Sequence, residues 1–398
     1  LDYARYDYGT SFIWVPEISG SRAFMYKNPE LQDTLLAVLN FDMTGPDLEK
    51  TDTYLRMKMT PDSRPSYLND LVANLLQFVD QTEIRTQTGN NAPFNYRLVP
   101  YISASDHAIF LDAGIPAMQF NHWSDNFYHS SEDRAVNSDP TELKRVAFMG
   151  AAAFTYLANA GANEARDLAW EAAANGEKWI VEVTRQSVRL LGDDAARVHE
   201  RRKAAQNKIT GAFNRARGGV ESVLSLSADA SVKTAVQRLV AGLETVRDVE
   251  AKKLEAVYQD RCQALGVKPQ TVAPTPAEIE AGDLVPRKLF KLYTDDYRTR
   301  AEQMAKLLPE RPRVTGLAAS EVPAFIDGAR SLLDISNAVR AEYGNVTTSS
   351  HDFKFAYIVT PETPDIELEA MVGYMRAMEK AGPVEITKKT HAPKPVKR

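Results

Sequence analysis

Cysteine is nearly absent from this chain, whose 398 residues contain only Cys262. A single cysteine excludes an internal disulfide framework and a cysteine-rich zinc site. Its position inside a helical apolar pattern predicts a small buried side chain. Long apolar runs are also missing, since none approaches the roughly 20 residues that a membrane-spanning helix needs. The sequence therefore predicts no membrane span.

A large excess of one charge is missing as well. The formal net charge is −5, which gives no reason to expect a nucleic-acid partner. The basic run that ends the chain, from Lys388 to Arg398, is short, and such tails are usually solvated. With 44% hydrophobic and 25% charged residues, the composition is that of an ordinary globular protein. The length permits two or three domains.

Strand and helix patterns alternate in the first 160 residues. Short apolar runs rich in β-formers predict buried strands, and apolar residues at helical spacing predict helices. The predicted strands are residues 11–15, 35–41 and 115–120, and the predicted helices are residues 67–79 and 142–158. Asp139 and Pro140 supply an N-cap and a first-turn proline for the second helix. The predicted fold class is α/β, part of a mostly parallel sheet with helices on both faces, followed by an all-α extension.

The composition changes after Gly161, where Ala, Glu, Arg, Lys and Val dominate and strand signals end. Apolar residues at alternating three- and four-residue steps predict a long helix packed in an antiparallel bundle. They are Val232, Val236, Leu239, Leu243 and Val246. The predicted units are an α/β domain at 1–160, a helical bundle at 161–268, a linker at 269–280, a helical region at 281–386 and a disordered basic tail at 387–398. The last helix is expected to end near Gly382, before a short β-like run.

Three acidic or imidazole side chains follow the predicted strands of the first domain. Glu17 and Asp42 each end a strand and precede a glycine turn, and His129 follows the third strand after a short loop. Because the carboxyl ends of parallel strands meet at one edge of a sheet, these side chains are expected to converge. Two carboxylates and an imidazole suit a borderline divalent metal such as zinc. Taken singly, an acid at such a position is more often a helix N-cap.

Four motifs in this region resemble the C-terminal half of an M28-family zinc aminopeptidase. They are WVPEISGSRA at 14–23, LNFDMTG at 39–45, SDHAIF at 105–110 followed by GIP at 114–116, and YHSSED at 128–133. Their order and approximate spacing are those of the family, and they cover the first 160 residues. The resemblance implies a zinc-exopeptidase fold and hydrolysis of N-terminal residues from peptides. Residues 161–398 do not share it.

The resemblance also implies roles for individual residues. The family uses two zinc ions and a water that attacks the peptide carbonyl, and motif matching makes Asp42 a ligand of one ion and His129 of the other. Glu17 stands where the family has two adjacent glutamates, so it is either a zinc ligand or the general base. Tyr128 is either a donor to the oxyanion or a packing aromatic. The segment with Asp106 is expected to support the site from outside it.

Part of the family's ligand set has no counterpart in the sequence. The family has a His-x-Asp segment and a metal-bridging aspartate before its glutamate motif, whereas 16 residues precede Glu17 here and none of the six histidines lies before Asp42. We therefore expect the missing N-terminal half of the same protein, or a companion chain, to complete the site. The chain alone is expected to be an incomplete and inactive peptidase. Most proteins that resemble it are secreted or periplasmic, and the near absence of cysteine permits that location.

Two other functions stay open at this stage. The first is a glutaminyl-cyclase-like enzyme, which binds a single zinc through Asp, Glu and His. The second is a non-catalytic, peptidase-like domain whose helical extension mediates assembly. That extension offers a surface for homo-oligomerisation, for covering the active site or for docking on a partner, and its mixed charge favours none of them.

Overall fold

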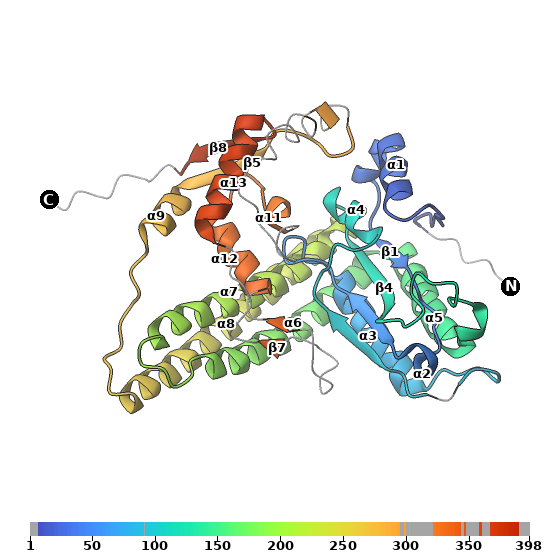
Figure 1. The fold of residues 1–398 in the computed structure, drawn as a ribbon, viewed down its shortest axis with the longest axis horizontal. Coiled ribbons are helices and arrows are strands. Elements are labelled where there is room, and N and C mark those ends of the chain that lie inside the picture. The colour runs from blue at the N-terminus through green and yellow to red at the C-terminus, as the bar shows by residue number, and fades with distance from the viewer. Residues whose placement is uncertain are drawn as a thin grey trace.

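Figure 1 shows the fold in a computed structural model, in which a sheet with flanking helices is followed by long helices and a smaller C-terminal lobe. The structure describes residues 7–90, 92–294, 298–299, 302, 321–343, 346–347, 358–359 and 367–389. The first part contains α1 (Ser19–Lys27), η1 (Pro29–Asp33), β1 (Val38–Phe41), α2 (Leu48–Thr51), β2 (Tyr54–Lys58), α3 (Leu68–Thr82), β3 (Tyr96–Val99), α4 (His107–Asp112), β4 (Ala117–Trp123), η2 (Ala135–Asn137) and α5 (Pro140–Ala158). The predicted helices at 67–79 and 142–158 are confirmed as α3 and α5. Asp139 caps α5 by accepting a hydrogen bond from Thr141 N, and Pro140 fills the first turn.

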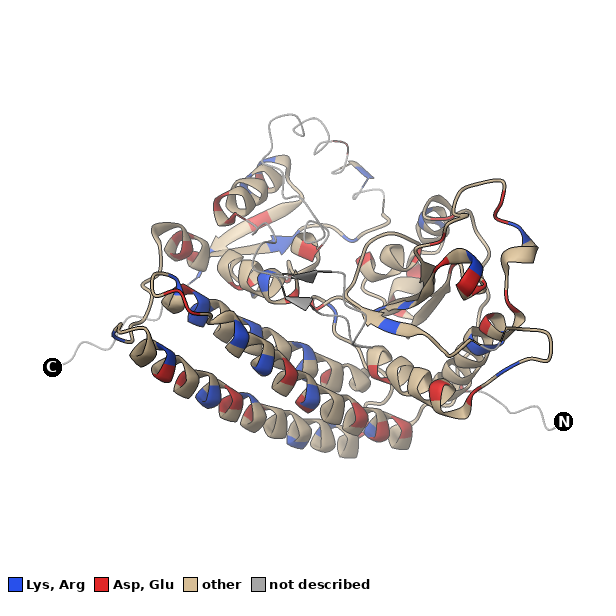
Figure 2. Cartoon of the chain, turned by 60° about the horizontal axis from the view of Figure 1, so that its bottom comes forward, with Lys and Arg blue, Asp and Glu red and all other residues tan. Residues whose placement is uncertain are grey.

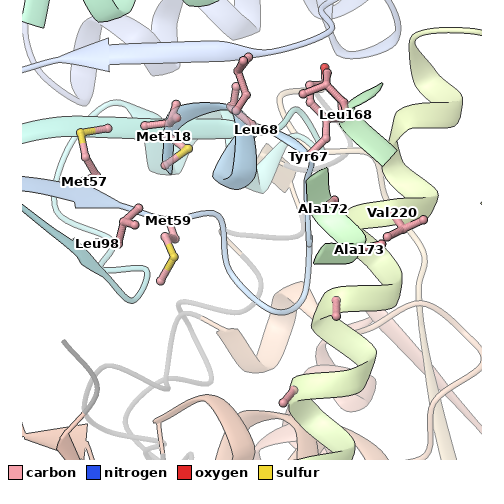
Figure 3. Close-up of a cluster of buried hydrophobic side chains, with 14 of the residues drawn as sticks. Met57, Met59, Tyr67, Leu68, Leu98, Met118, Leu168, Ala172, Ala173 and Val220 are labelled. Atoms are coloured by element: carbon pink, nitrogen blue, oxygen red, sulfur yellow. The ribbon is translucent and has the colours of Figure 1, made fainter. Parts of the chain in front are cut away.

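The sheet has the strand order β1-β4-β2-β3 and is mostly parallel, as predicted. β4 runs parallel to β1 and antiparallel to β2, while β2 runs parallel to β3. One face is apolar and meets α3, α5 and the long helices. Figure 3 shows that Met57 and Met118 from the sheet, Tyr67 beside α3, and Leu168 and Val220 from the long helices belong to one cluster of buried side chains. A single core therefore continues from the sheet into the helical part.

The other face of the sheet is apolar only beside β1 and the start of β4. There Ala117 packs with Ile109 and Phe110 of α4, Met25 of α1 and the more distant Tyr293. Tyr293 donates its hydroxyl to the Ile109 carbonyl at 3.0 Å. Helices therefore cover both faces of the sheet, as predicted, although the rest of this second face is polar.

The prediction of a strand at residues 11–15 is wrong. These residues form an irregular segment whose aromatic side chains are largely exposed, Phe12 by 69% and Trp14 by 86%. The two rings stack with their centroids 6.1 Å apart, and Phe12 packs edge-on against Phe154 of α5. Among the strands that the structure describes, β1 pairs with β4 alone. An apolar run forms a strand only where a neighbour satisfies its backbone groups, and residues 11–15 have none in the described chain.

Three long helices follow the sheet and pack against one another, as the composition predicted. They are α6 (Ala162–Leu190), α7 (Val198–Ser222), which continues into η3 (Val223–Ser225), and α8 (Ala230–Ala264). The predicted stripe of α8 faces its neighbours, with Val232, Val236 and Leu243 buried, and Cys262 is buried too. Figure 2 shows acidic and basic residues interspersed along these helices. None of the helices in the described ranges combines the length and apolarity needed to cross a membrane.

The C-terminal lobe has its own core and is not all-α, which corrects the prediction for this part of the chain. It comprises α9 (Pro276–Asp283), β5 (Leu284–Lys288), α11 (Glu321–Ala324), α12 (Leu332–Tyr343), α13 (Leu368–Ala381) and β8 (Val384–Lys388), and a further short pair joins β6 (Val346–Thr347) to β7 (Ile358–Val359). β5 pairs antiparallel with β8, about 100 residues later. Strand pairing over that separation leaves no pattern in the local sequence that could predict it. The predicted end of the last helix near Gly382 and the short strand after it are confirmed as the end of α13 and as β8.

Two predicted boundaries in this part also shift. The linker at 269–280 ends earlier, because Thr275 and Glu278 form a capping box that begins α9 at Pro276. Disorder does not begin at residue 387, because Thr387 and Lys388 pair with β5 and Lys389 N donates to Asp283 O. Residues 390–398 of the predicted tail lie outside the described residues.

Buried carboxyl groups join the C-terminal lobe to the rest of the chain. Glu342 of α12 accepts a hydrogen bond from Asp62 N at 3.2 Å, and Asp62 pairs with Arg215 of α7 at 2.7 Å. Burial raises the pKa of Glu321 to about 7 and that of Glu342 well above its usual range, with Asp62 adding repulsion in both cases. Four further charged groups lie around this contact: Lys208 on α7, Arg64 after β2, Asp112 on α4 and Lys288 on β5.

We expect the docking of the C-terminal lobe to weaken as the pH rises from about 4.5 through about 7. A carboxyl group with a raised pKa in the folded state contributes stability when it is protonated and loses it on ionisation. Glu342→Gln keeps the acceptor for Asp62 N and removes the charge, so at pH 8 it should raise the stability of the lobe by about 1–3 kcal/mol. Hydrogen exchange of α12 at pH 5 and pH 8 measures this. Glu369→Gln, on an exposed position of α13, is the control, and equal gains at both pH values would contradict the prediction.

Candidate active site

Asp42 follows β1 directly, and its carboxylate is held on one side by two donors. Its Oδ2 accepts hydrogen bonds from Gln119 Nε2 at 2.7 Å and from Ser105 Oγ at 3.0 Å. Asn40 Nδ2 donates to the same Ser105 oxygen, which fixes the hydroxyl. Oδ1 has no hydrogen-bond donor among the residues that the structure describes. A carboxylate oriented in this way through one oxygen presents the other for binding, as metal-ligating carboxylates do.

Glu17 lies in a tight turn that Asp106 holds in place. Asp106 Oδ1 accepts hydrogen bonds from Ile18 N at 2.7 Å and from Ser21 Oγ at 2.5 Å. Gly20 is required in this turn, because a Cβ atom there would lie 2.7 Å from Pro16 and Val15 side-chain atoms. The side chain of Glu17 is exposed. Asp106 therefore fixes the backbone of the turn that carries Glu17.

His129 lies in the exposed loop after β4. Its ring stacks on Tyr128 with 3.7 Å between the centroids, and Tyr128 packs edge-on against Trp123 at 4.8 Å. Asp125 begins the loop and accepts a hydrogen bond from Phe127 N at 2.7 Å. The Tyr128 ring thus packs against two aromatic neighbours, and the residue is 41% exposed.

Left-handed backbone conformations mark all three candidate motifs. Ile18 follows Glu17 with φ 59°, Met43 follows Asp42 with φ 55°, and His129 itself has φ 54°. Such values are uncommon outside glycine and are true outliers for a β-branched residue such as Ile18. Each costs about 1–3 kcal/mol, and residues of this kind cluster at functional sites. The three motifs share this feature with Asp52, Glu83 and Tyr293, of which Asp52 and Glu83 end helices.

A buried lysine connects two of the candidates. Lys58 at the end of β2 is 4% exposed, and burial together with Arg56 lowers its pKa to about 8, while Asp42 and Glu17 oppose that shift. Both carboxylates thus act on the same ammonium group. Nearby, burial lowers the pKa of His107 to about 3, and His107 Nε2 lies 3.1 Å from Ile102 O. His107 is a neutral, buried side chain near the site.

A second polar network lies behind the Asp42 turn and was missed by the sequence reasoning. His122 Nδ1 lies 3.0 Å from Met43 O, and its Nε2 lies 3.5 Å from Glu142 Oε2. Glu142 pairs with Arg145 one turn further along α5, and Arg145 also donates to the Ile84 carbonyl at 3.0 Å. All three side chains are almost completely buried. The one signal in the sequence was a histidine within an apolar strand.

The donors in the described chain do not by themselves fit a zinc site. Zinc in proteins takes three or four ligands from His, Cys, Asp or Glu. No group of three such side chains is placed to hold a metal in the part of the chain that the structure describes. Glu17 and Asp42 both lie within electrostatic range of Lys58. His129 does not form a group of possible metal ligands with them among the described residues. The ligand roles of Glu17, Asp42 and His129 and the catalytic role of Tyr128 stay predictions.

Comparison with known proteins gives a match to one family model in this region. No solved structure matches the chain. The candidate residues Glu17, Asp42, Tyr128 and His129 all lie in one matched segment, which begins at the Glu17 turn and ends within α5. Residues 17–154 match the family model of Peptidase family M28.

Proposed function

We propose that residues 17–154 are part of a metal-dependent aminopeptidase that hydrolyses N-terminal residues from peptides. The main support is Asp42, whose carboxylate is oriented through Oδ2 by Gln119 and Ser105 inside the segment that matches Peptidase family M28. The left-handed residues at all three candidate motifs add to it. A single-zinc cyclase and a non-catalytic domain remain the alternatives, and no feature of the described residues favours either.

In this proposal the metal is zinc, with two ions in the complete domain. Zinc bound there would supply Lewis-acid chemistry toward water and the peptide carbonyl. Asp42 and His129 would each hold one ion, and Glu17 would be a ligand or the general base. The hydroxyl of Tyr128 would donate to the oxyanion. We also propose a secreted or periplasmic location.

We further propose that an N-terminal half of the same protein, or a companion chain, supplies the remaining ligands beside β1. β1 pairs with β4 alone among the described strands, and an unpaired strand edge is a template for another strand. The side chains beside that edge are apolar and exposed, since Phe41 is 40% exposed and Phe12 and Trp14 more so. Exposed apolar patches of this kind mark interaction surfaces.

One experiment separates these possibilities. We expect the purified chain to bind less than one zinc per molecule by elemental analysis and to leave leucine p-nitroanilide intact. A sample that also contains the proposed N-terminal half or companion chain should bind close to two zinc ions and release p-nitroaniline. Close to one zinc with cyclisation of N-terminal glutamine would support the cyclase-like enzyme instead. Neither zinc nor turnover in the complete protein would overturn the proposed peptidase.

A further inference from the structure

One face of the sheet carries a row of basic side chains. Arg56 and Lys58 alternate along β2 and therefore point to the same side. Arg97 of β3 lies directly opposite Arg56 in the register, so it shares that side too. Lys58 and Arg97 are at least nine-tenths buried. Three cations thus lie on adjacent strands of one sheet face, where like charges repel.

Two of these cations make no direct ion pair, although Asp42 and Glu17 act on the Lys58 ammonium electrostatically. The Lys58 ammonium makes no hydrogen bond or ion pair with the residues that the structure describes. Arg56 Nε is buried and has no acceptor within the described ranges. Burial lowers the pKa of Arg56 to about 10 and contributes to the lowered pKa of Lys58. An unpaired buried charge is costly, and an anion that pairs with it offsets that cost.

Aromatic rings hold the two arginines on this face. The Arg97 guanidinium lies over the Tyr54 ring, 4.3 Å from its centroid, and the Arg56 guanidinium lies 5.7 Å from the centroid of Trp123. A ring contact of this kind favours one orientation of the guanidinium group, and at Arg56 it leaves Nε without an acceptor among the described residues. A planar, bidentate acceptor such as a carboxylate matches the N–H edges of a guanidinium group.

The basic row lies next to the candidate active site. Gln119 of β4 is opposite Lys58 in the register and donates to Asp42 at 2.7 Å. Asp42 directly follows β1, and β2 lies two strands away from β1 in the sheet. That separation is about 10 Å. An extended peptide covers that span in about three residues. A peptide whose N-terminus lies at Glu17 and Asp42 therefore places its second or third residue at the basic row.

We propose that Arg56 and Lys58 bind a carboxylate of the peptide substrate, two or three residues from its N-terminus. This inference rests on the proposed aminopeptidase function and narrows its substrate class to short peptides with a free C-terminus or an acidic side chain at that position. Arg97 adds positive charge beside the site. The carboxylate would supply the partner that Lys58 and Arg56 lack.

Binding of peptides to the chain tests the inference without any turnover. By isothermal titration, Leu-Gly-Gly should bind at least about tenfold more tightly than its C-terminal amide, since hydrogen bonds to charged groups are of that strength. Leu-Gly-Glu-amide should regain the affinity if side-chain carboxylates are accepted. Lys58→Met should abolish the difference between acid and amide, whereas Lys178→Met, on an exposed position of α6, should keep it.

The outcomes separate this inference from the proposed function. Equal affinity for acid and amide, or a difference that survives in Lys58→Met, would overturn the carboxylate site even if peptides are hydrolysed. Tighter binding of inorganic phosphate than of Leu-Gly-Gly would assign the site to phosphate. That result would also overturn the proposed carboxylate site. A preference for the acid in the chain, together with neither zinc nor turnover in a sample that also contains the completing half or companion chain, would leave the site standing and remove the peptidase function. Arg56→Gln is the second variant, should Lys58→Met fail to give the circular dichroism spectrum of the wild type.

Discussion

Replacing Asp42 with Asn is expected to lower the proposed peptide hydrolysis at least about 100-fold in a preparation that binds zinc, with a matching loss of zinc affinity. Gln119 and Ser105 both donate to Oδ2, so the carbonyl oxygen of the new amide must take that position. Its NH2 group then occupies the place of Oδ1. An amide nitrogen has no lone pair for a metal, and its hydrogens repel one. The change therefore removes the proposed ligand atom while every described hydrogen bond of the side chain is kept.

The same hydrogen bonds supply the controls for this prediction. Asp52→Asn alters an exposed aspartate on the same domain and should leave zinc content and turnover unchanged. Ser105→Ala removes one of the two donors, so it should cause an intermediate loss of about tenfold. Zinc content by elemental analysis and kcat/KM with leucine p-nitroanilide are the measurements. An Asp42→Asn enzyme that keeps its zinc and its turnover would exclude Asp42 from the metal centre.

Helices were the part of the fold that could be predicted from sequence. The spacing of apolar residues fixes a helix locally, and caps such as Asp139 and Gly382 mark its ends without reference to the rest of the chain. The mostly parallel character of the sheet followed in the same way from short apolar runs that alternate with helices, whereas the order of its strands was not predicted. The polar end of β1 then led to Asp42, whereas Glu17 was found after residues 11–15, which form no strand. Both carboxylates do act on one buried group, Lys58.

The features that were predicted wrongly or missed depend on contacts between distant segments. Residues 11–15 have the composition of a strand, but a strand needs a neighbour, and the described sheet offers them none. β5 pairs with β8 across about 100 residues, so its own sequence carries no turn signal. Lys58 was missed because a lone lysine in an apolar run resembles an exposed edge position. Only the register of β2 with β4 shows that it is buried beside the site.

The second large effect is expected from the buried network behind the Asp42 turn. Arg145→Met leaves Glu142 without its guanidinium partner at a position where both side chains are almost fully buried. It also removes donors to the carbonyls of Ile84 and Ala92. Breaking a buried ion pair by removing one partner costs about 3–5 kcal/mol, because the remaining charge stays in a poor solvent. Urea denaturation followed by circular dichroism measures the shift of the midpoint.

Two further variants distinguish an ion-pair effect from a packing effect. Arg134→Met removes an exposed pair with Glu132, and a surface pair contributes less than about 1 kcal/mol. Glu142→Gln combined with Arg145→Met removes the orphaned charge, so it should recover part of the loss. The network also reaches the active site, because His122 lies between Glu142 and the Met43 carbonyl, one residue after Asp42. Arg145→Met enzyme that remains folded should therefore also lose zinc affinity. If it loses stability and keeps full zinc affinity, the network stabilises the fold without positioning Asp42.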